Sequence, residues 1–388
     1  MSVFDRRSFL KTSGAGIIPA FIPFHGLFHG HLTPGDNNTR TVKFFGDGEM
    51  FEPAEYVQEL QNANAKSIIV KDRYGTGGAV EQLEKKFAEL TGKEKAICFP
   101  SGTMANELAI DVLCGDKTKA FVPENSHIYR DEADSAQQIF GNRLMPLGEG
   151  HHFFTLEHLK DAISKIDKDE AFKTGAGVLT IENPVRRADG RAVPLEEIKK
   201  ISEYCKSKQI KMHLDGARIF IASAWTGVPV KEYASYFDTV YVSLYKYFGA
   251  SGGAVLCGSA EVIDKMALLI KVHGGTIYSN WLNAAMAIHR LDGFEERQKE
   301  VIVRSKELIL GLNNINGLQM SMLDNGTNIH LLKLPKSIDG AKFQDKLLKE
   351  FNIKIGRPDE QNELKMTMNE TLLYMDVKDI VDVFRKFI

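Results

Sequence analysis

Cysteine is scarce in this chain of 388 residues, and the few cysteines present are far apart. None of them belongs to a CxxC pair or to another spacing typical of metal ligands, so the sequence implies neither a disulfide framework nor a metal site. Two of them lie inside apolar runs and are interpreted as small buried hydrophobic residues. The four cysteines are Cys98, Cys114, Cys205 and Cys257.

An excess of one charge and a long apolar run are also lacking. The net charge of -2 gives no reason to expect nucleic acid or an anionic membrane as a partner. The apolar stretch near the N-terminus is too short, and too rich in glycine and proline, to be a spanning helix, so we expect no stable membrane insertion. A hydrophobic share of 43% suits a globular protein with one large domain and a smaller one.

Two adjacent arginines, Arg6 and Arg7, precede that apolar stretch. The pattern resembles a twin-arginine export signal, and we interpret residues 1–35 as this signal and a linker, which predicts an exported, periplasmic protein. The alternative is a basic N-terminus without a signal, in a cytoplasmic protein. Three histidines follow between residues 25 and 31, and a linker explains them better than a metal site because no acidic or cysteine partners accompany them.

Strands and helices are predicted to alternate from about residue 40 onward. This alternation is typical of an α/β domain with a mostly parallel sheet, which we assign to residues 40–290. Residues 295–388 are predicted to form a smaller C-terminal α+β domain. The predicted strands are 96–99, 120–123, 177–181, 210–214, 239–244, 253–257, 327–334 and 353–355, and the predicted helices are 79–90, 104–113, 195–208, 295–313, 341–350 and 376–387.

An acid and a lysine end two successive predicted strands. Asp215 follows the strand 210–214, and Lys246 follows the strand 239–244, with a glycine-rich turn behind it. Pyridoxal phosphate (PLP) chemistry needs such a pair, because a lysine amine condenses with the cofactor aldehyde and a carboxylate keeps the pyridine nitrogen protonated. Each residue also has an ordinary explanation. Lys246 is equally a snorkelling lysine, and Asp215 is equally a buried acid that pairs with Arg218.

Other strand ends carry polar residues that suit a phosphorylated cofactor. Ser101, Gly102 and Thr103 precede a predicted helix, whose N-terminal N–H groups and dipole favour a phosphate, although Ser and Thr are also ordinary N-caps. His127 is either a residue that stacks on a flat ring or acts as a base, or a surface histidine. Glu182 either hydrogen bonds to ring substituents or begins a turn.

These strand-end residues lie within motifs that follow one another in a fixed order along the chain. The motifs are Tyr74–Gly78, Leu83–Glu84, Pro100–Met104, Ser126–Tyr129, Glu182–Asn183, Gly190–Leu195, His213–Arg218 and Ser243–Lys246. Together they resemble the threonine aldolase and aromatic amino acid β-eliminating lyase family of fold-type I PLP enzymes. The resemblance implies a large domain with a mostly parallel seven-stranded sheet, PLP as the cofactor, an amino acid as the substrate, and a homodimer or homotetramer.

The resemblance also implies three groups of site residues. The catalytic group is Lys246, as the lysine that binds the cofactor, His127, which stacks on its ring, and Asp215, which holds the pyridinium. The cofactor-binding group is Ser101, Gly102, Thr103, His127, Glu182, Asp215, Arg218 and Lys246. The substrate-binding group is Arg218, Lys365 and Tyr74.

Some substrate-binding positions depart from the family's pattern. The family's Ser-Asp-Thr segment is Gly46–Gly48 here, an arginine of its Gly-Gly-Met-Arg-Gln segment is Ile277, and its C-terminal arginine is Lys365. Lysine is not equivalent to arginine at a bidentate carboxylate site. The cofactor residues are therefore kept while substrate residues are altered. The candidate replacement cations are Arg186, Arg187 and Arg357.

The sequence therefore predicts a PLP-dependent lyase that cleaves a β-hydroxy-α-amino acid to glycine and an aldehyde. In this interpretation the substrate amine displaces Lys246, Asp215 supports the electron-accepting ring, and His127, or a water that it orders, transfers the proton. One alternative is β-elimination, racemisation or transamination of another amino acid. The other is a non-catalytic binding protein with the same fold.

Overall fold

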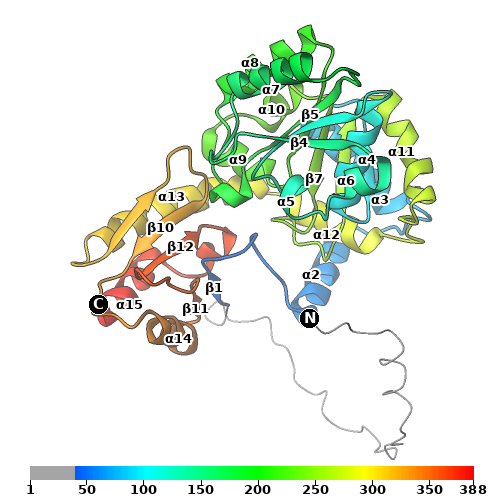
Figure 1. Ribbon diagram of the computed structural model, residues 1–388. Coiled ribbons are helices and arrows are strands. Elements are labelled where there is room, and N and C mark those ends of the chain that lie inside the picture. Colours follow the sequence, from blue (N-terminus) through cyan, green and yellow to red (C-terminus); the bar gives the residue numbers. More distant parts are fainter. Residues whose placement is uncertain (1–39) are drawn as a thin grey trace, which may run out of the picture. The chain divides into compact units, whose positions relative to one another are not determined.

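The computed structural model describes residues 40–388 (Figure 1). The predicted export signal and linker, residues 1–35, lie outside the described residues. The strands are β1 (Val42–Lys43), β2 (Lys95–Phe99), β3 (Lys119–Pro123), β4 (Arg143–Leu147), β5 (Ala176–Glu182), β6 (Lys211–Asp215), β7 (Thr239–Ser243), β8 (Ala254–Gly258), β9 (Gln319–Met322), β10 (Ile329–Lys333), β11 (Ile353–Lys354) and β12 (Glu363–Thr367). The helices are α2 (Pro53–Lys66), α3 (Gly78–Thr91), α4 (Gly102–Cys114), α5 (His127–Arg130), α6 (Ser135–Phe140), α7 (Leu156–Asp169), α8 (Leu195–Ser207), α9 (Ile219–Thr226), α10 (Val230–Ser235), α11 (Ala260–Val272), α12 (Trp281–Leu291), α13 (Phe294–Asn313), α14 (Gly340–Phe351) and α15 (Val377–Phe387).

Seven strands form the large sheet, in the order β2-β8-β7-β6-β5-β3-β4. The five adjacent strands β7, β6, β5, β3 and β4 pair in parallel, whereas β8 runs antiparallel to both of its neighbours, β2 and β7. Strands β3 and β7 are buried along their whole length, as expected where helices cover both faces of a sheet. The prediction of an α/β fold with a mostly parallel seven-stranded sheet is confirmed.

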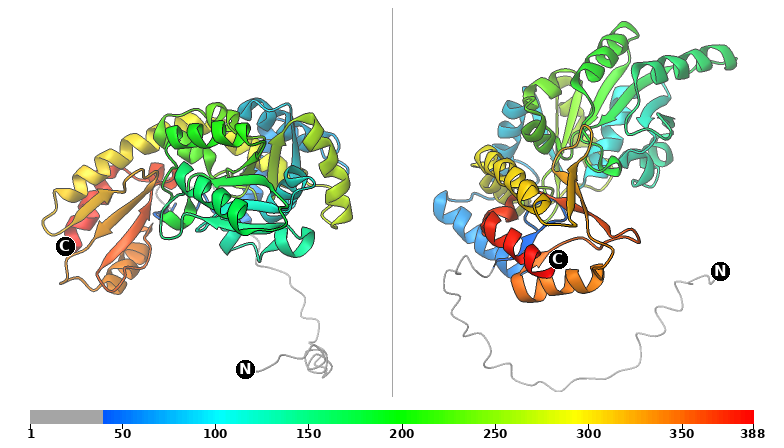
Figure 2. Two further views of the ribbon diagram at one scale, coloured as in Figure 1. Left: turned by 45° about the horizontal axis from the view of Figure 1, so that its top comes forward. Right: turned by 90° about the vertical axis from the view of Figure 1, so that its left-hand side faces the viewer.

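A separate core lies in the C-terminal part of the described chain. It is built on an antiparallel sheet in the order β12-β10-β9 and on the parallel pair β1-β11. The long helix α13 leads from the large sheet to these elements (Figure 2). Val42 of β1 pairs with Ile353 of β11, so a strand within the predicted range 40–290 packs into the C-terminal core. The domain boundaries themselves stay a prediction.

The parallel strands bring several predicted site residues to one edge of the large sheet. Strand β5 ends at Glu182, β6 ends at Asp215, and β7 leads into the turn that holds Lys246. This edge is where ligands bind in open α/β sheets. Among residues 40–388, no helix has the length and apolar character that crossing a membrane requires.

Candidate active site

Lys246 lies in a tight turn between β7 and the antiparallel strand β8. Its side chain is buried, with 6% of the residue exposed, and Nζ lies 5.2 Å from the centre of the Tyr245 ring. The next residue, Tyr247, has a left-handed backbone (φ 71°), and its N–H donates to the carbonyl of Asp47 at 2.9 Å. These backbone features fix the turn. The buried side chain of Lys246 therefore lies at the carboxyl end of β7.

Asp215 is the last residue of β6 and is buried. Its Oδ1 accepts a hydrogen bond from the N–H of Ala217 at 3.2 Å, and its Oδ2 lies 3.4 Å from Nδ2 of Asn106. A buried carboxylate needs such donors, because desolvation otherwise disfavours its charged form. Asp215 is thus held as an acceptor one strand away from the turn of Lys246.

The N-terminus of α4 borders a cavity of about 220 Å³ beside these residues. Ser101 caps the helix, since its Oγ accepts from the N–H of Met104 at 3.2 Å. A Cβ atom at Gly102 would lie 2.1 Å from the hydroxyl oxygen of Tyr241, so only glycine lets the helix approach this closely. The first N–H groups of a helix have no partner within it, and together with the dipole they form an anion site. The cavity lining includes Ser101, Gly102, Thr103, His127, Tyr241 and Tyr245.

His127 begins α5 and faces the same cavity. Its backbone N–H donates to Oε2 of Glu182 at 2.7 Å, and its Nδ1 lies 3.0 Å from Oε1 of Glu132. The hydrogen bond to Glu132 raises the pKa of the imidazole above its ordinary value, and the negative charge of Asp215 adds to this effect. Because Nδ1 is tied to Glu132, Nε2 is the ring nitrogen that remains available to a ligand.

The carboxylate of Glu182 hydrogen bonds to the backbone of two segments, at His127 and at Arg186. Its Oε2 accepts from the N–H of His127, and its Oε1 accepts from the N–H of Arg186, both at 2.7 Å. Burial, with a further effect of the neighbouring Asp215, raises the pKa of its carboxyl group to about 7. The cofactor-binding role of Glu182 stays a prediction, whereas its hydrogen bonds fix the position of His127.

Three further residues of this site had no role assigned from the sequence. Glu132 lies between His127 and Asn106, and Asn106 in turn reaches both Asp215 and His213. A sequence signal existed for His213, because residues two apart on a strand point to the same side of the sheet, and His213 therefore shares a side with Asp215. No comparable signal marked Glu132, which lies outside regular secondary structure.

The predicted substrate-binding residues are arranged differently. Arg218 is bound by both carboxylate oxygens of Asp47, at 2.5 and 2.7 Å. Lys365 lies on β12 and forms an ion pair with Asp189, and its side chain is 60% exposed. Tyr74 is more than half exposed and packs edge to face against Tyr278, with ring centres 5.2 Å apart. None of the three predicted substrate-binding residues lines the cavity beside α4.

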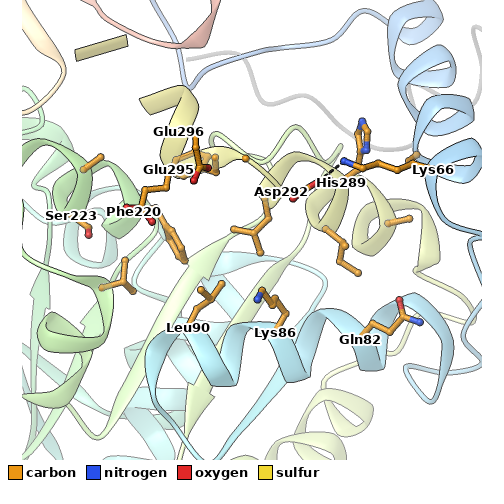
Figure 3. A pocket seen from close by; sticks show the side chains of 18 of the residues that line it. Lys66, Gln82, Lys86, Leu90, Phe220, Ser223, His289, Asp292, Glu295 and Glu296 are labelled. Carbon is orange, nitrogen blue, oxygen red and sulfur yellow. Dashed lines mark hydrogen bonds and ion pairs between the residues drawn. The ribbon is translucent and has the colours of Figure 1, made fainter. Parts of the chain in front are cut away.

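A larger cavity of about 1110 Å³ lies between α2, α3, α9, α12 and α13 (Figure 3). Its charged residues are largely paired with one another or with neighbours, as in the ion pair of Lys66 with Asp292 and that of Lys299 with Glu295 at 2.8 Å. None of the predicted site residues lines it. The smaller cavity is therefore the candidate active site, because the predicted site residues His127 and Ser101–Thr103, at the N-terminus of α4, line it.

The residues around the smaller cavity fit PLP. A buried lysine amine, a buried carboxylate one strand away, and the free N–H groups of α4 match its aldehyde, pyridine nitrogen and phosphate. Lys246, Asp215 and Glu182 are not among the residues that line this cavity in the described chain. They lie next to it, because Glu182 accepts from the N–H of the lining residue His127, and the charges of Asp215 and Lys246 act on the same histidine. Within residues 40–388, no group of three or more His, Cys, Asp or Glu side chains is arranged to hold a metal ion.

The chain is similar along most of its length to several known proteins. The chain is 29% identical over 358 residues to "Probable low-specificity L-threonine aldolase 2" of Arabidopsis thaliana, which covers 89% of the chain and 97% of the relative. A crystal structure of a candidate L-allo-threonine aldolase from Listeria monocytogenes EGD-E superposes with a TM-score of 0.75, at 24% identity, over 90% of this chain and 97% of that one. A serine palmitoyltransferase from S. paucimobilis with bound PLP and myriocin has the same fold, with a TM-score of 0.63 at 15% identity, over 89% and 86% of the two chains.

The match to a protein family covers most of the chain. Residues 54–336 match the family described as Beta-eliminating lyase, and this range includes Lys246, Asp215, His127 and the N-terminus of α4. The predicted resemblance is thereby confirmed. The chain belongs to the beta-eliminating lyase family.

Proposed function

We propose that this protein is a PLP-dependent lyase that cleaves a β-hydroxy-α-amino acid to glycine and an aldehyde. The observation that carries the proposal is the position of Lys246 and Asp215 at the ends of adjacent strands, beside the N-terminus of α4. The L-threonine aldolase named among its relatives aligns along 89% of the chain. The site residues and the family therefore support the same reaction class.

Each residue of the site has a distinct task in this reaction. PLP, when bound, supplies an aldehyde that condenses with amines and a ring that accepts an electron pair. Lys246 would provide the amine that holds the cofactor until the amine of the substrate replaces it. Asp215 accepts the hydrogen bond of the pyridine N–H and keeps that nitrogen protonated. The N–H groups of Gly102 and Thr103 bind the phosphate.

His127 is the proposed general base for the β-hydroxyl proton. Its Nδ1 is occupied by Glu132 at 3.0 Å, which leaves Nε2 to accept a proton on the cavity side. Glu132 stabilises the imidazolium that results, as its effect on the His127 pKa indicates. Removal of this proton would let the Cα–Cβ bond break and the aldehyde depart, with the electron pair of that bond passing toward the cofactor ring. Cα would then take up one proton, which gives glycine.

The test is an assay of purified protein loaded with PLP. We expect L-threonine, L-allo-threonine or phenylserine to yield glycine and the matching aldehyde in equal amounts. Lys246→Ala should abolish turnover, whereas Lys265→Ala, at an exposed lysine of α11, should leave it unchanged. A wild-type protein that binds PLP but releases no glycine from any of these substrates would contradict the proposal.

A second candidate function changes the bond that is broken. Arg218 and Lys365, which the family pattern assigns to the substrate carboxylate, are both paired with acids of this chain. A substrate held by other groups would orient Cα–H, instead of Cα–Cβ, for cleavage. Formation of a keto acid or of a D-amino acid without glycine would support β-elimination, transamination or racemisation. A protein that changes no amino acid and shows no spectral response to any would be a binding protein.

The homo-oligomer predicted from the family is also proposed for this chain. Tyr74, Tyr278 and Ile277 are large apolar residues that the single chain leaves 41–62% exposed. Their segment passes close to the candidate site, because a Cβ atom at Gly275, two residues before Ile277, would lie 3.2 Å from Cγ of Pro100 in the cavity lining. A second copy that covers this surface would remove it from water. Light scattering should show a dimer or tetramer, and Tyr278→Arg should shift it toward the monomer.

Export remains a proposal that rests on Arg6 and Arg7 alone. We expect the full chain to reach the periplasm of a bacterial host through its twin-arginine pathway. Replacement of both arginines by lysine should retain the protein in the cytoplasm, as measured by cell fractionation. Equal periplasmic amounts of the two proteins would overturn the proposal.

A further inference from the structure

A continuous chain of buried hydrogen bonds runs beneath the candidate site. Thr239 Oγ1 lies 2.8 Å from Nδ1 of His213, and Nε2 of His213 lies 3.0 Å from Oδ1 of Asn106. The amide nitrogen of Asn106 then reaches Oε1 of Glu132 at 2.9 Å and Oδ2 of Asp215 at 3.4 Å. All five residues are at most 5% exposed. Water therefore does not compete for the bonds that join Thr239, His213 and Asn106, whereas Glu132 also borders the candidate cavity.

The chemistry of the partners fixes the direction of each hydrogen bond. Burial lowers the pKa of His213 to about 4, so its ring is neutral near pH 7 and carries one N–H. The amide oxygen of Asn106 only accepts, so that N–H is on Nε2, and Nδ1 accepts from the hydroxyl of Thr239. His213 thereby turns the NH₂ group of Asn106 toward the two acids. An amide NH₂ has two hydrogens, one for each carboxylate.

This amide joins the two groups on which the proposed reaction depends. Asp215 supports the pyridine nitrogen, and Glu132 holds His127. The two carboxyl groups are buried near each other, and a shared donor offsets the repulsion and the desolvation that oppose their ionisation. Asn106 touches neither the cofactor nor the reacting atoms, and its contribution is to fix the two acids relative to each other.

We propose that Asn106 is a positioning residue that sets Asp215 and the His127–Glu132 pair in their working arrangement, with its amide orientation fixed by His213. The inference rests on the proposed function for its catalytic meaning. Its structural content, a single amide coupled to two acids, is independent of which amino acid is the substrate.

The test compares three variants in this buried region. Asn106→Leu removes the donors at nearly constant size, and Asn106→Asp replaces the NH₂ group by an oxygen. The control is Thr180→Val on β5, in register with His213, because the Thr180 hydroxyl is buried and has no hydrogen-bond partner. Circular dichroism and thermal unfolding establish that each variant folds.

The first readout is the affinity of the unloaded protein for PLP, measured by absorbance titration. Loss of hydrogen bonds to charged groups should weaken binding roughly 10- to 100-fold in both Asn106 variants. Thr180→Val should bind within about twofold of the wild type. Asn106 variants that fold and bind PLP as the wild type does would overturn the inference.

The second readout is the NMR titration of the His127 imidazole in the unloaded protein. Asn106 stabilises the anionic form of Glu132, so its loss should raise the apparent pKa of the His127–Glu132 pair by about 0.5–1 unit. The other charged groups near His127 are Asp215, Lys246, Asp131 and Glu182, and all four are unchanged in Asn106→Leu and in the control. An unaltered titration in Asn106→Leu would also overturn the inference. If Asn106 only filled space in the core, its replacement by leucine would leave the pKa of the His127–Glu132 pair unchanged.

A milder variant decides the outcome if the Asn106 variants do not fold. Thr239→Val removes the hydroxyl that donates to His213 and should weaken PLP binding about threefold, with the same direction of change in the His127 titration. A Thr239→Val protein that behaves as the wild type in both readouts would overturn the inference. A wild-type protein that binds PLP but cleaves no β-hydroxy amino acid refutes the proposed function alone, because both readouts are made without substrate.

Discussion

The guanidinium of Arg218 donates two hydrogen bonds to Asp47, a residue 171 positions earlier in the chain, at 2.5 and 2.7 Å. Both side chains are mostly withdrawn from water, with 12% of the Arg218 side chain and 27% of the Asp47 side chain exposed. A pair of this kind is costly to break from one side, because the remaining charge stays buried without its partner.

Asp47→Asn should therefore destabilise the protein. We expect the free energy of unfolding to fall by about 2–4 kcal/mol, as measured by urea denaturation. Asp292→Asn is the matched control, since its ion pair with Lys66 is more than 60% exposed on both sides and should contribute little to stability. Equal effects of the two substitutions would show that Arg218 does not depend on Asp47.

Lys365→Ala should change the KM for the amino acid by no more than about threefold. Lys365 is exposed and paired with Asp189, so it contributes little to a ligand in the cavity beside α4. Steady-state kinetics with the substrate that gives the highest turnover provides the measurement. A rise in KM of more than about tenfold would restore Lys365 as the carboxylate-binding residue.

Glu132→Gln should shift the pH dependence of turnover. The hydrogen bond to Glu132 raises the pKa of His127, so its loss lowers that pKa. A base must be unprotonated to act, and the acidic limb of the kcat profile should therefore move to lower pH by about one unit, with kcat reduced roughly 10-fold. The profile of Glu124→Gln, an acid outside this network, should coincide with that of the wild type. A limb that does not move in Glu132→Gln would assign it to another group.

The strand-end residues could be predicted because they follow from local patterns. Apolar runs fixed the ends of β6 and β7, and the rule that parallel strands end at one edge then placed Asp215 and the turn of Lys246 together. The partners of Arg218 and Asn106 could not be predicted in this way. Asp47 and Glu132 lie in irregular segments, and side chains that meet across 171 or 26 residues leave no periodic signal.

The same limit applies to the C-terminal core. Val42 and Phe44 belong to a short apolar segment, which alone does not indicate its pairing partner. Strand β1 is two residues long and is completed by β11, and residues of α13 and α15 pack in the same core. Contacts at such sequence separation are decided by how the remaining surfaces fit, and the pattern of a single sequence does not contain that information.

Glu84→Gln should flatten the pH dependence of stability. Burial raises the pKa of Glu84 to about 7 from 4.5, while its Oε1 accepts from the N–H of Cys98 at 2.8 Å. An acid with a raised pKa in the folded state contributes stability that is complete below its unfolded pKa and is lost as the pH rises through its folded pKa.

The wild type should therefore lose roughly 1–3 kcal/mol of this contribution between about pH 5 and pH 8, and Glu84→Gln should not. The glutamine oxygen can still accept from Cys98, so the comparison isolates the charge. Glu81→Gln is the control, because Glu81 is exposed on the same helix and pairs with Lys85 at 2.7 Å. Urea midpoints at the two pH values give the difference, and parallel losses in the wild type and Glu84→Gln would refute the assignment.

Gly102→Ala should weaken cofactor binding, because the new methyl group would lie 2.1 Å from the hydroxyl oxygen of Tyr241. Either the N-terminus of α4 or the Tyr241 ring must move, and both border the cavity. The N–H groups of Gly102 and Thr103 would then no longer be positioned to donate hydrogen bonds to the phosphate of PLP. We expect the affinity for PLP to fall roughly 10- to 100-fold. The control is Gly356→Ala, which lies outside this cavity and meets only the carbonyl oxygen of Lys365 at 3.4 Å, and it should bind PLP within about twofold of the wild type. An absorbance titration of each unloaded variant measures the effect. Unchanged affinity in Gly102→Ala would place the phosphate away from the N-terminus of α4.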